Sequence, residues 1–197
     1  MTFNLSAEEL AEVGFASLGS DVRIDRRAAL FNPSAIHLGS HVRVDAFAVL
    51  AGGREPLRIG SFVHVGASCY VSAGSGGIEI GDFATLAPRV AVHGTSDDYL
   101  HGSLTGGIVP QALAENTSDL VRIGRHVIVG SGSVILPGVD LGEGAAVGSL
   151  TTVKGTVSGG AVVAGTPMRV VRQRVVDRFE ALELKAWAMA DGDTEHS

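Results

Sequence analysis

The sequence contains a single cysteine, Cys69, and aromatic residues make up only 5% of its 197 positions. One thiol excludes an intrachain disulfide framework and argues against a thiolate metal cluster built by one chain. Because large rings are scarce, the core must consist mainly of Val, Ile, Leu and Ala, and glycine reaches 27 residues. This composition suits many narrow, regularly stacked layers better than a globule anchored on aromatic side chains.

Concentrated positive charge and long apolar stretches are also missing. The net charge is −6 and no run of Lys or Arg exceeds two residues, so we expect no nucleic-acid partner. No apolar stretch approaches the roughly 18 residues that a membrane-spanning helix needs. Glu8, Glu9 and Glu12 lie where a signal peptide would carry positive charge before an apolar run. The sequence therefore predicts a cytoplasmic protein without a transmembrane segment.

A six-residue repeat runs along most of the chain. Six segments share an aliphatic residue followed by glycine, with a second aliphatic residue six positions after the first. They read LGSDVRID, LGSHVRVD, IGSFVHVG, IGDFATLA, IGRHVIVG and LGEGAAVG, and begin at Leu18, Leu38, Ile59, Ile80, Ile123 and Leu141. A period of six fits neither the 3.6-residue period of an α-helix nor the two-residue alternation of a strand.

Each hexad is interpreted as a short strand followed by a corner. The aliphatic side chain points into the coil, and the small residue after it permits a tight turn. Three hexads close one coil, and stacked coils hydrogen-bond as parallel strands, which predicts an all-β solenoid of roughly six coils. A glycine-rich antiparallel sandwich is the alternative, but its strands are rarely spaced so regularly.

Both ends of the chain are predicted to cap the solenoid, since terminal coils would otherwise expose their cores. Residues 1–17 contain an S-x-x-E capping box, formed by Ser6 and Glu9, ahead of a short helix. The solenoid domain is expected to span residues 18–168. A C-terminal helix is predicted over 169–190 from apolar residues spaced three or four apart, followed by a disordered tail over 191–197.

One long interruption breaks the repeat, and it is predicted to form an external loop over residues 93–122. It gathers His93, Asp97, Asp98 and His101 within nine residues. Long loops on rigid scaffolds tend to carry function, and two histidines beside two aspartates are more than loops usually supply. The alternative is a solvated polar loop without chemical importance.

The chain resembles the hexapeptide-repeat acyltransferase superfamily over roughly residues 18 to 172, most strongly from Ile123 onward, and in particular the galactoside and maltose acetyltransferases. AGTPMRVVR matches the closing A-G-x-P-x-R-x-I-x-R signature of that family. SDDYLHGSLTGGIVP resembles a subgroup associated with modification of surface polysaccharides. The resemblance implies a left-handed parallel β-helix, a homotrimer with sites between subunits, and acetyl-CoA as the acyl donor. The implied acceptor is a hydroxyl of a sugar, a sugar nucleotide or a polysaccharide precursor.

The implied chemistry is direct transfer, in which a general base takes the acceptor's proton while its oxygen attacks the thioester. Histidine suits this role near neutral pH, and His93 is the first choice because a strand anchors it. His101 is the second. Counting from Ala87 and Pro88, however, the family's catalytic histidine should fall near Asp97. An aspartate base or a loss of activity therefore stays open, with Asp97 and Asp98 as orienting groups or plain loop charges.

The last coils are the predicted acetyl-CoA site. Small residues with exposed backbone N–H groups suit a pantetheine arm, and basic residues suit the phosphates of the nucleotide. The alternative role for the arginines is salt bridging to the terminal helix or a neighbouring subunit. The candidates are Gly130, Ser131, Gly148, Ser149, Thr151, Lys154, Arg169 and Arg172.

Two other functions compete with sugar O-acetylation. One is N-acetylation of an amino sugar nucleotide, which the sequence does not separate from O-acetylation. The other is a non-catalytic or metal-binding trimer that resembles the gamma-class carbonic anhydrases. The H-G-C ending of that family is absent, since His93 and Gly94 are followed by Thr95, so no metal is expected. His41, His64 and His126 are expected to line the outer faces of the coils.

Overall fold

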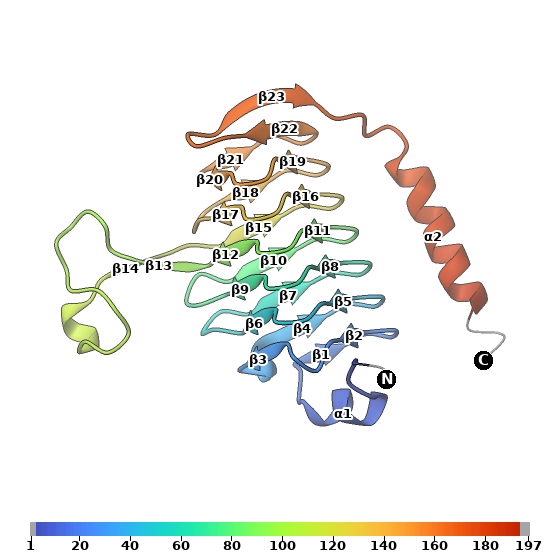
Figure 1. The fold of residues 1–197 in the computed structure, drawn as a ribbon, viewed down its shortest axis with the longest axis horizontal. Helices are drawn as coiled ribbons and strands as arrows, with labels where there is room; N and C mark the ends of the chain where they lie inside the picture. The colour runs from blue at the N-terminus through green and yellow to red at the C-terminus, as the bar shows by residue number, and fades with distance from the viewer. Residues whose placement is uncertain (1–2, 194–197) are drawn as a thin grey trace.

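The computed structural model describes residues 3–193, and its centre is a solenoid with three flat faces (Figure 1). Each face is a sheet of strands from successive coils, paired in parallel except where β23 joins β22. The first face consists of β1 (Ser17–Leu18), β4 (Ile36–Leu38), β7 (Leu57–Ile59), β10 (Ile78–Ile80), β15 (Val121–Ile123), β18 (Asp140–Leu141) and β21 (Thr156–Val157). The predicted parallel β-solenoid is confirmed.

The other two faces follow the same order. The second consists of β2 (Arg23–Ile24), β5 (Arg43–Val44), β8 (His64–Val65), β11 (Thr85–Leu86), β16 (Ile128–Val129), β19 (Ala146–Val147), β22 (Ala161–Ala164) and β23 (Arg169–Gln173). The third consists of β3 (Ala29–Phe31), β6 (Val49–Ala51), β9 (Tyr70–Ser72), β12 (Ala91–His93), β17 (Val134–Ile135) and β20 (Thr152–Val153). Each of the six complete coils, from β1–β3 to β18–β20, thus contributes one strand to every face, and β21, β22 and β23 follow at the C-terminal end.

The core is the column of aliphatic residues that the repeat predicts. From Leu18 to Val153 these residues are buried, apart from two members of the first coil. Leu18 is exposed and Leu30 is half-buried, because the first coil has a neighbouring coil on only one side. Burial of many aliphatic side chains in register supplies the main stabilisation of such a fold.

The N-terminal cap forms as predicted. The helix α1 (Ala7–Glu12) begins after Ser6, whose hydroxyl accepts from the Glu9 N–H at 3.2 Å. In return the Ser6 N–H donates to the Glu9 carboxylate at 2.7 Å. Leu10 joins the core, and both oxygens of Glu9 accept from Arg26 at 2.6 Å. The helix is therefore fixed to the first coil by burial and by an ion pair.

The C-terminal cap differs from the prediction at its start. Residues 169–173 form β23, antiparallel to β22, and the helix α2 spans Phe179–Asp193. The last coil leaves an edge of unpaired backbone groups, and the β-branched Val170 and Val171 favour a strand there. The disordered tail predicted over 191–197 is wrong for residues 191–193, which belong to α2, and residues 194–197 lie outside the described residues.

Stacked rings follow the corner between the first and second faces. His41, Phe62, Phe83 and His126 occupy equivalent turn positions with φ of 56° to 59°. Their neighbouring ring centroids lie 4.5, 4.7 and 5.3 Å apart, which matches the spacing of adjacent strands. Phe179 of α2 continues the stack at 4.3 Å from His126. We call these five side chains the aromatic ladder.

The helix α2 packs along this ladder (Figure 1). The Trp187 ring meets Phe62 edge-on at 4.6 Å, and Glu183 contacts both Arg125 and His126. Gly144 follows His126 in the same file, and a Cβ there would lie 2.8 Å from a methyl carbon of Val176. The absence of a side chain at Gly144 therefore leaves room for Val176, in the segment that joins β23 to α2.

Because Trp187 is the only tryptophan, its fluorescence reports the docking of α2. Replacing Phe179 by Ala removes the ring that ends the ladder, and an aromatic pair contributes about 0.5–1.5 kcal/mol. We expect the Trp187 emission of F179A to shift to longer wavelength, with little change in the melting of the solenoid. The exposed Phe31 gives the matched control, F31A. Unchanged emission in F179A would show that α2 is held without the ladder.

Candidate active site

Four of the predicted donor-site residues meet at one corner, between the second and third faces. Gly130 and Ser131 follow β16, while Gly148 and Ser149 follow β19 one coil further on. The Leu150 N–H donates to the Ser131 carbonyl at 2.9 Å, which holds the two turns in register. The structure therefore brings these four residues side by side.

Buried hydroxyl groups fix this corner. The Ser133 hydroxyl donates to the Gly148 carbonyl at 2.9 Å and accepts from the Thr151 N–H at 3.2 Å. The Thr151 hydroxyl accepts in turn from the Gly165 N–H at 3.1 Å. Ser133 and Thr151 are both buried. Thr151, a predicted binding residue, thus supports the corner from inside the coil rather than facing a ligand.

The glycine at position 130 is needed for coil stacking. A Cβ at Gly130 would lie 2.5 Å from the backbone nitrogen of Ser149, a distance that real Cβ atoms do not reach. The close approach of the two turns is therefore enough to explain why position 130 is a glycine. On the outer surface of this corner, the small residues Ser131 and Ser149 remain available to contact a ligand.

The three predicted cations are spread over the end of the solenoid. Arg169 and Arg172 are exposed on β23, opposite Ala164 and Val162 respectively. Lys154 lies at a different corner, between the third and first faces. The structure therefore separates Lys154 from the two arginines, although all three border the last coils.

His93 ends β12 on the outer side of the third face, where it is half-buried. Its ring centroid lies 5.5 Å from that of Tyr70 on the neighbouring strand. Burial lowers the pKa of His93 below its usual value, because a charged imidazolium loses hydration there. The neutral ring, which can accept a proton, is therefore the prevalent form at neutral pH.

The register of the third face also places Lys154 in the same column as His93, two coils away. Val92 pairs with Ile135, and Ile135 pairs with Val153. Because His93 follows Val92 and Lys154 follows Val153, the two residues occupy equivalent positions two coils apart. Adjacent strands lie about 4.8 Å apart, which puts their backbones roughly 10 Å from one another. Sequence reasoning missed Tyr70 as the neighbour of His93, and it missed that Lys154 lies two coils away in the same column, although counting the repeat from coil to coil would have found both.

The long interruption leaves this same column and projects from the solenoid (Figure 1). It starts as a hairpin of β13 (Thr95–Asp97) and β14 (Asn116–Ser118) and includes the short 3-10 helix η2 (Gln111–Leu113); another, η1 (Pro33–Ala35), lies in the first coil. Asp97 is exposed and pairs with Asn116. The side-chain amide of Asn116 lies 3.3 Å from Asp97 Oδ1, within reach to donate.

Asp98 organises the tip of the loop. Its carboxylate is 4% exposed and accepts from the N–H groups of Leu100, His101 and Ser103 at 2.8 to 3.2 Å. The ring of His101 also contacts it, with Nδ1 at 3.0 Å from Oδ1. These N–H donors hold the pKa of Asp98 well below its usual range.

The predicted catalytic residues thus fall into three places. His93 lies at the base of the hairpin, Asp97 at the end of β13, and Asp98 with His101 at the start of the tip. A strand rises about 3.3 Å per residue, so Asp98 is roughly 16 Å along the chain from His93. Of these four residues, His101 and Asp98 contact each other within one chain. The ring of His93 instead contacts the ring of Tyr70.

The loop offers one group of side chains that could bind a metal ion. Among residues 3–193, Asp98, His101 and Glu115 place one ligand atom each within 4.8 Å of one another. Both oxygens of Asp98 already accept N–H groups, so they are poorly placed to bind a cation as well. Of the other histidines, His64 contacts Asp45 at 2.8 Å on the second face. Within one chain, this group of donors is therefore a poor fit for a metal ion.

The single thiol is not available for covalent catalysis. Cys69 is buried, and its Sγ donates to the Ala87 carbonyl at 3.1 Å. Burial raises the pKa of the thiol to about 11, and the thiolate is the reactive form of cysteine. This supports direct transfer rather than an acyl-cysteine intermediate.

The chain is similar to known acyltransferases over most of its length. A family model described as the hexapeptide repeat of succinyl-transferase matches residues 56–87 and 120–149. The dTDP-4-amino-4,6-dideoxy-D-glucose acyltransferase of Escherichia coli is 33% identical over 166 residues, which cover 84% of this chain and 86% of that protein. The chain belongs to the hexapeptide-repeat acyltransferases.

Solved structures of AntD, an N-acyltransferase from Bacillus cereus, share the fold of this acyltransferase. The complex of AntD with dTDP and 3-hydroxybutyryl-CoA is 34% identical, has a TM-score of 0.88, and covers 98% of this chain and 100% of its own. A variant of AntD bound to dTDP-4-amino-4,6-dideoxyglucose and coenzyme A is 34% identical, with a TM-score of 0.90 and coverage of 96% and 99%.

The role of Asp98 can be tested by hydrogen exchange. In D98A the N–H groups of Leu100, His101 and Ser103 lose a charged acceptor, and such bonds contribute about 1.5–3 kcal/mol. We expect these amides to exchange at least about tenfold faster, while those of the solenoid strands are unchanged. D119N, at another exposed aspartate of the loop, is the control. Equal exchange in wild type and D98A would show that the loop tip is ordered by other contacts.

Proposed function

We propose that this acyltransferase moves an acyl group from an acyl-CoA thioester to the amino group of a nucleotide-linked sugar. The full-length similarity to the E. coli enzyme and to AntD carries the proposal, since both are named for acylation of an amine or an amino sugar. The relatives favour the N-acylation alternative over the hydroxyl acceptor expected from sequence. The donor seen with AntD, 3-hydroxybutyryl-CoA, leaves the acyl chain open beyond acetyl.

The reaction needs one proton removed and one supplied. The amine nitrogen bonds to the thioester carbon, the C–S bond breaks, and the sulfur leaves as a thiolate that takes up a proton. A general base accepts the proton of the amine, and N–H groups stabilise the oxyanion in between. The outer surface of the corner at Ser131 and Ser149 suits the pantetheine arm, and Arg169 and Arg172 suit the phosphates.

Asp97 is the proposed base for an amine acceptor. It lies where the family's spacing expects the catalytic group, its carboxylate is exposed at the end of β13, and the Asn116 amide beside it can orient one oxygen. AntD has been solved with substitutions of an aspartate. A carboxylate also attracts the amine of the acceptor and accepts the proton that the nitrogen loses as it bonds to the thioester carbon, whereas histidine, the stronger base, suits a hydroxyl acceptor. His93 is the second candidate, on the strength of its neutral ring.

A homotrimer is part of the proposal, because the loop exposes apolar side chains that a single chain leaves uncovered. Tyr99, Leu100 and Ile108 are 88, 86 and 99% exposed, although Asp98 holds the segment in a fixed shape. Ordered apolar groups in solvent mark an interaction surface. A second copy of this chain would cover them and could bring its own corner residues toward Asp97 and His93.

The overall activity can be tested with purified protein. We expect release of the coenzyme A thiol when acetyl-CoA or 3-hydroxybutyryl-CoA is offered with a dTDP-linked amino sugar, and much less with the matching dTDP-linked hydroxy sugar. The reason is that the amine is the better nucleophile and resembles the acceptors of the relatives. Thiol release with neither acceptor, together with no binding of coenzyme A, would contradict the proposal.

The base can be identified with two isosteric variants. D97N should lower kcat by about 10²–10⁴-fold, the usual contribution of a general base, whereas H93Q should keep kcat within a few-fold. D177N, at an exposed site between β23 and α2, is the matched control. The opposite pattern, with H93Q inactive and D97N active, would assign the role to His93 and restore the hydroxyl acceptor as the better alternative.

A further inference from the structure

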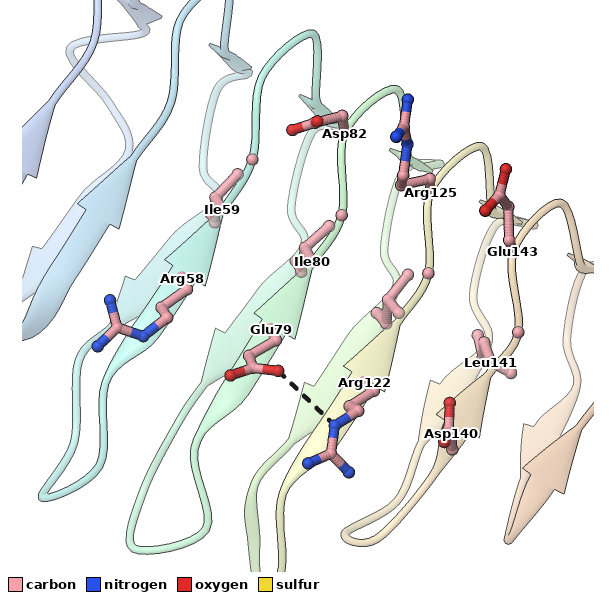
Figure 2. A pocket seen from close by; sticks show the side chains of 15 residues that line it. Arg58, Ile59, Glu79, Ile80, Asp82, Arg122, Arg125, Asp140, Leu141 and Glu143 are labelled. Atoms are coloured by element: carbon pink, nitrogen blue, oxygen red, sulfur yellow. Dashed lines mark ion pairs between the residues drawn. The ribbon is translucent and has the colours of Figure 1, made fainter. Parts of the chain in front are cut away.

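The outer surface of the first face carries a single file of charged side chains. Arg58, Glu79, Arg122 and Asp140 hold matching positions on the consecutive strands β7, β10, β15 and β18. They line a shallow depression of about 550 Å³, and Figure 2 shows them in a row across the strands. Their signs alternate from coil to coil, and we call this file the charge ladder.

Only the middle of the charge ladder is paired within one chain. Arg122 Nε lies 3.7 Å from Glu79 Oε2, and both side chains are about half exposed. Among residues 3–193, neither Arg58 nor Asp140 has an oppositely charged group within 4.0 Å. A single chain therefore leaves one positive and one negative group unpaired at the two ends of the ladder.

We propose that a second copy of this chain docks on the first face with its solenoid axis reversed. A two-fold axis that passes between Glu79 and Arg122, parallel to the strands, brings Arg58 of each copy opposite Asp140 of the other. It also brings the Glu79–Arg122 pair of one copy against the reversed pair of the other. Every charge in the ladder then faces an opposite charge, as a two-fold interface requires.

The order of the charges selects this arrangement over others. If the two solenoids ran in the same direction, each rung would meet its own copy, and Arg58 would oppose Arg58. Successive rungs lie about 4.8 Å apart, a spacing that an unrelated protein would match with a β-sheet carrying charges in the complementary order. A second copy matches it by construction, which is why we commit to that occupant.

The neighbouring corner repeats the pattern. Asp82 and Arg125 lie in the same two coils as Glu79 and Arg122, and their charges come in the same order (Figure 2). The same two-fold axis therefore brings Asp82 of one copy opposite Arg125 of the other. Arg125 also contacts Glu183 of α2 within its own chain. Two files with the same antisymmetry reinforce one docking direction.

Sedimentation of the full chain at two salt concentrations tests the proposal. Exposed ion pairs weaken as the Debye length falls from about 20 Å at 0.02 M salt to about 4 Å at 0.5 M. We expect the assembly at low salt to have twice the mass of the assembly at high salt. The high-salt mass separately reports whether the proposed trimer exists, so failure of one idea does not imply failure of the other.

Two charge reversals make the test specific. R58E alone places a glutamate opposite Asp140 in both contacts of a pair, and D140R alone places two arginines together, so neither variant should double. A mixture of R58E with D140R should double again, because both contacts in the mixed pair unite opposite charges. R43E, on the second face, should behave as wild type.

The result that would overturn the proposal is equally specific. Wild type that keeps the same mass at both salt concentrations contradicts it, and so does a mixture of R58E and D140R that fails to double while each variant melts as wild type does.

Discussion

Stacking of one coil on the next, at about 4.8 Å, is the constraint on which the other features depend. Aliphatic side chains fill the interior of each coil, and backbone hydrogen bonds fix its register against the next. Because the register is constant, residues at equivalent positions of successive coils form rows along the solenoid. These rows are the aromatic rings at one corner, the turns of small residues at another, and the alternating charges on the first face. Glycine is needed where turns come closest; a Cβ at Gly53 would lie 1.9 Å from the Gly74 carbonyl oxygen.

The sequence predicted the solenoid because its signal is local and repeated many times. The capping box at Ser6 was found for the same reason. The prediction for the start of the C-terminal cap was wrong. Residues 169–173 form a strand because the last coil leaves an open sheet edge, and the local sequence contains no signal for that edge. The contact of His93 with Tyr70 and its shared column with Lys154 were missed because both depend on the register of the third face.

The candidate site combines a rigid scaffold with a structured loop. The corner at Ser131 and Ser149 is fixed from inside by buried hydroxyl groups, whereas Asp97 projects on a hairpin whose tip is held by Asp98. An acyl donor and an acceptor must meet between such elements, and a neighbouring subunit can supply the corner that one chain holds away from its own loop. The proposed trimer and the proposed chemistry are therefore linked by geometry. The docking on the first face depends on neither.

The central claim is that the acceptor group is an amine, and the type of bond formed in the product tests it most directly. The protein is given one acyl-CoA together with equal amounts of a dTDP-linked amino sugar and its hydroxy counterpart, and the products are weighed by mass spectrometry before and after treatment with alkaline hydroxylamine. Our account predicts acylated amino sugar whose mass survives the treatment, as an amide does. An acylated product that loses its acyl group, as an ester does, would contradict it.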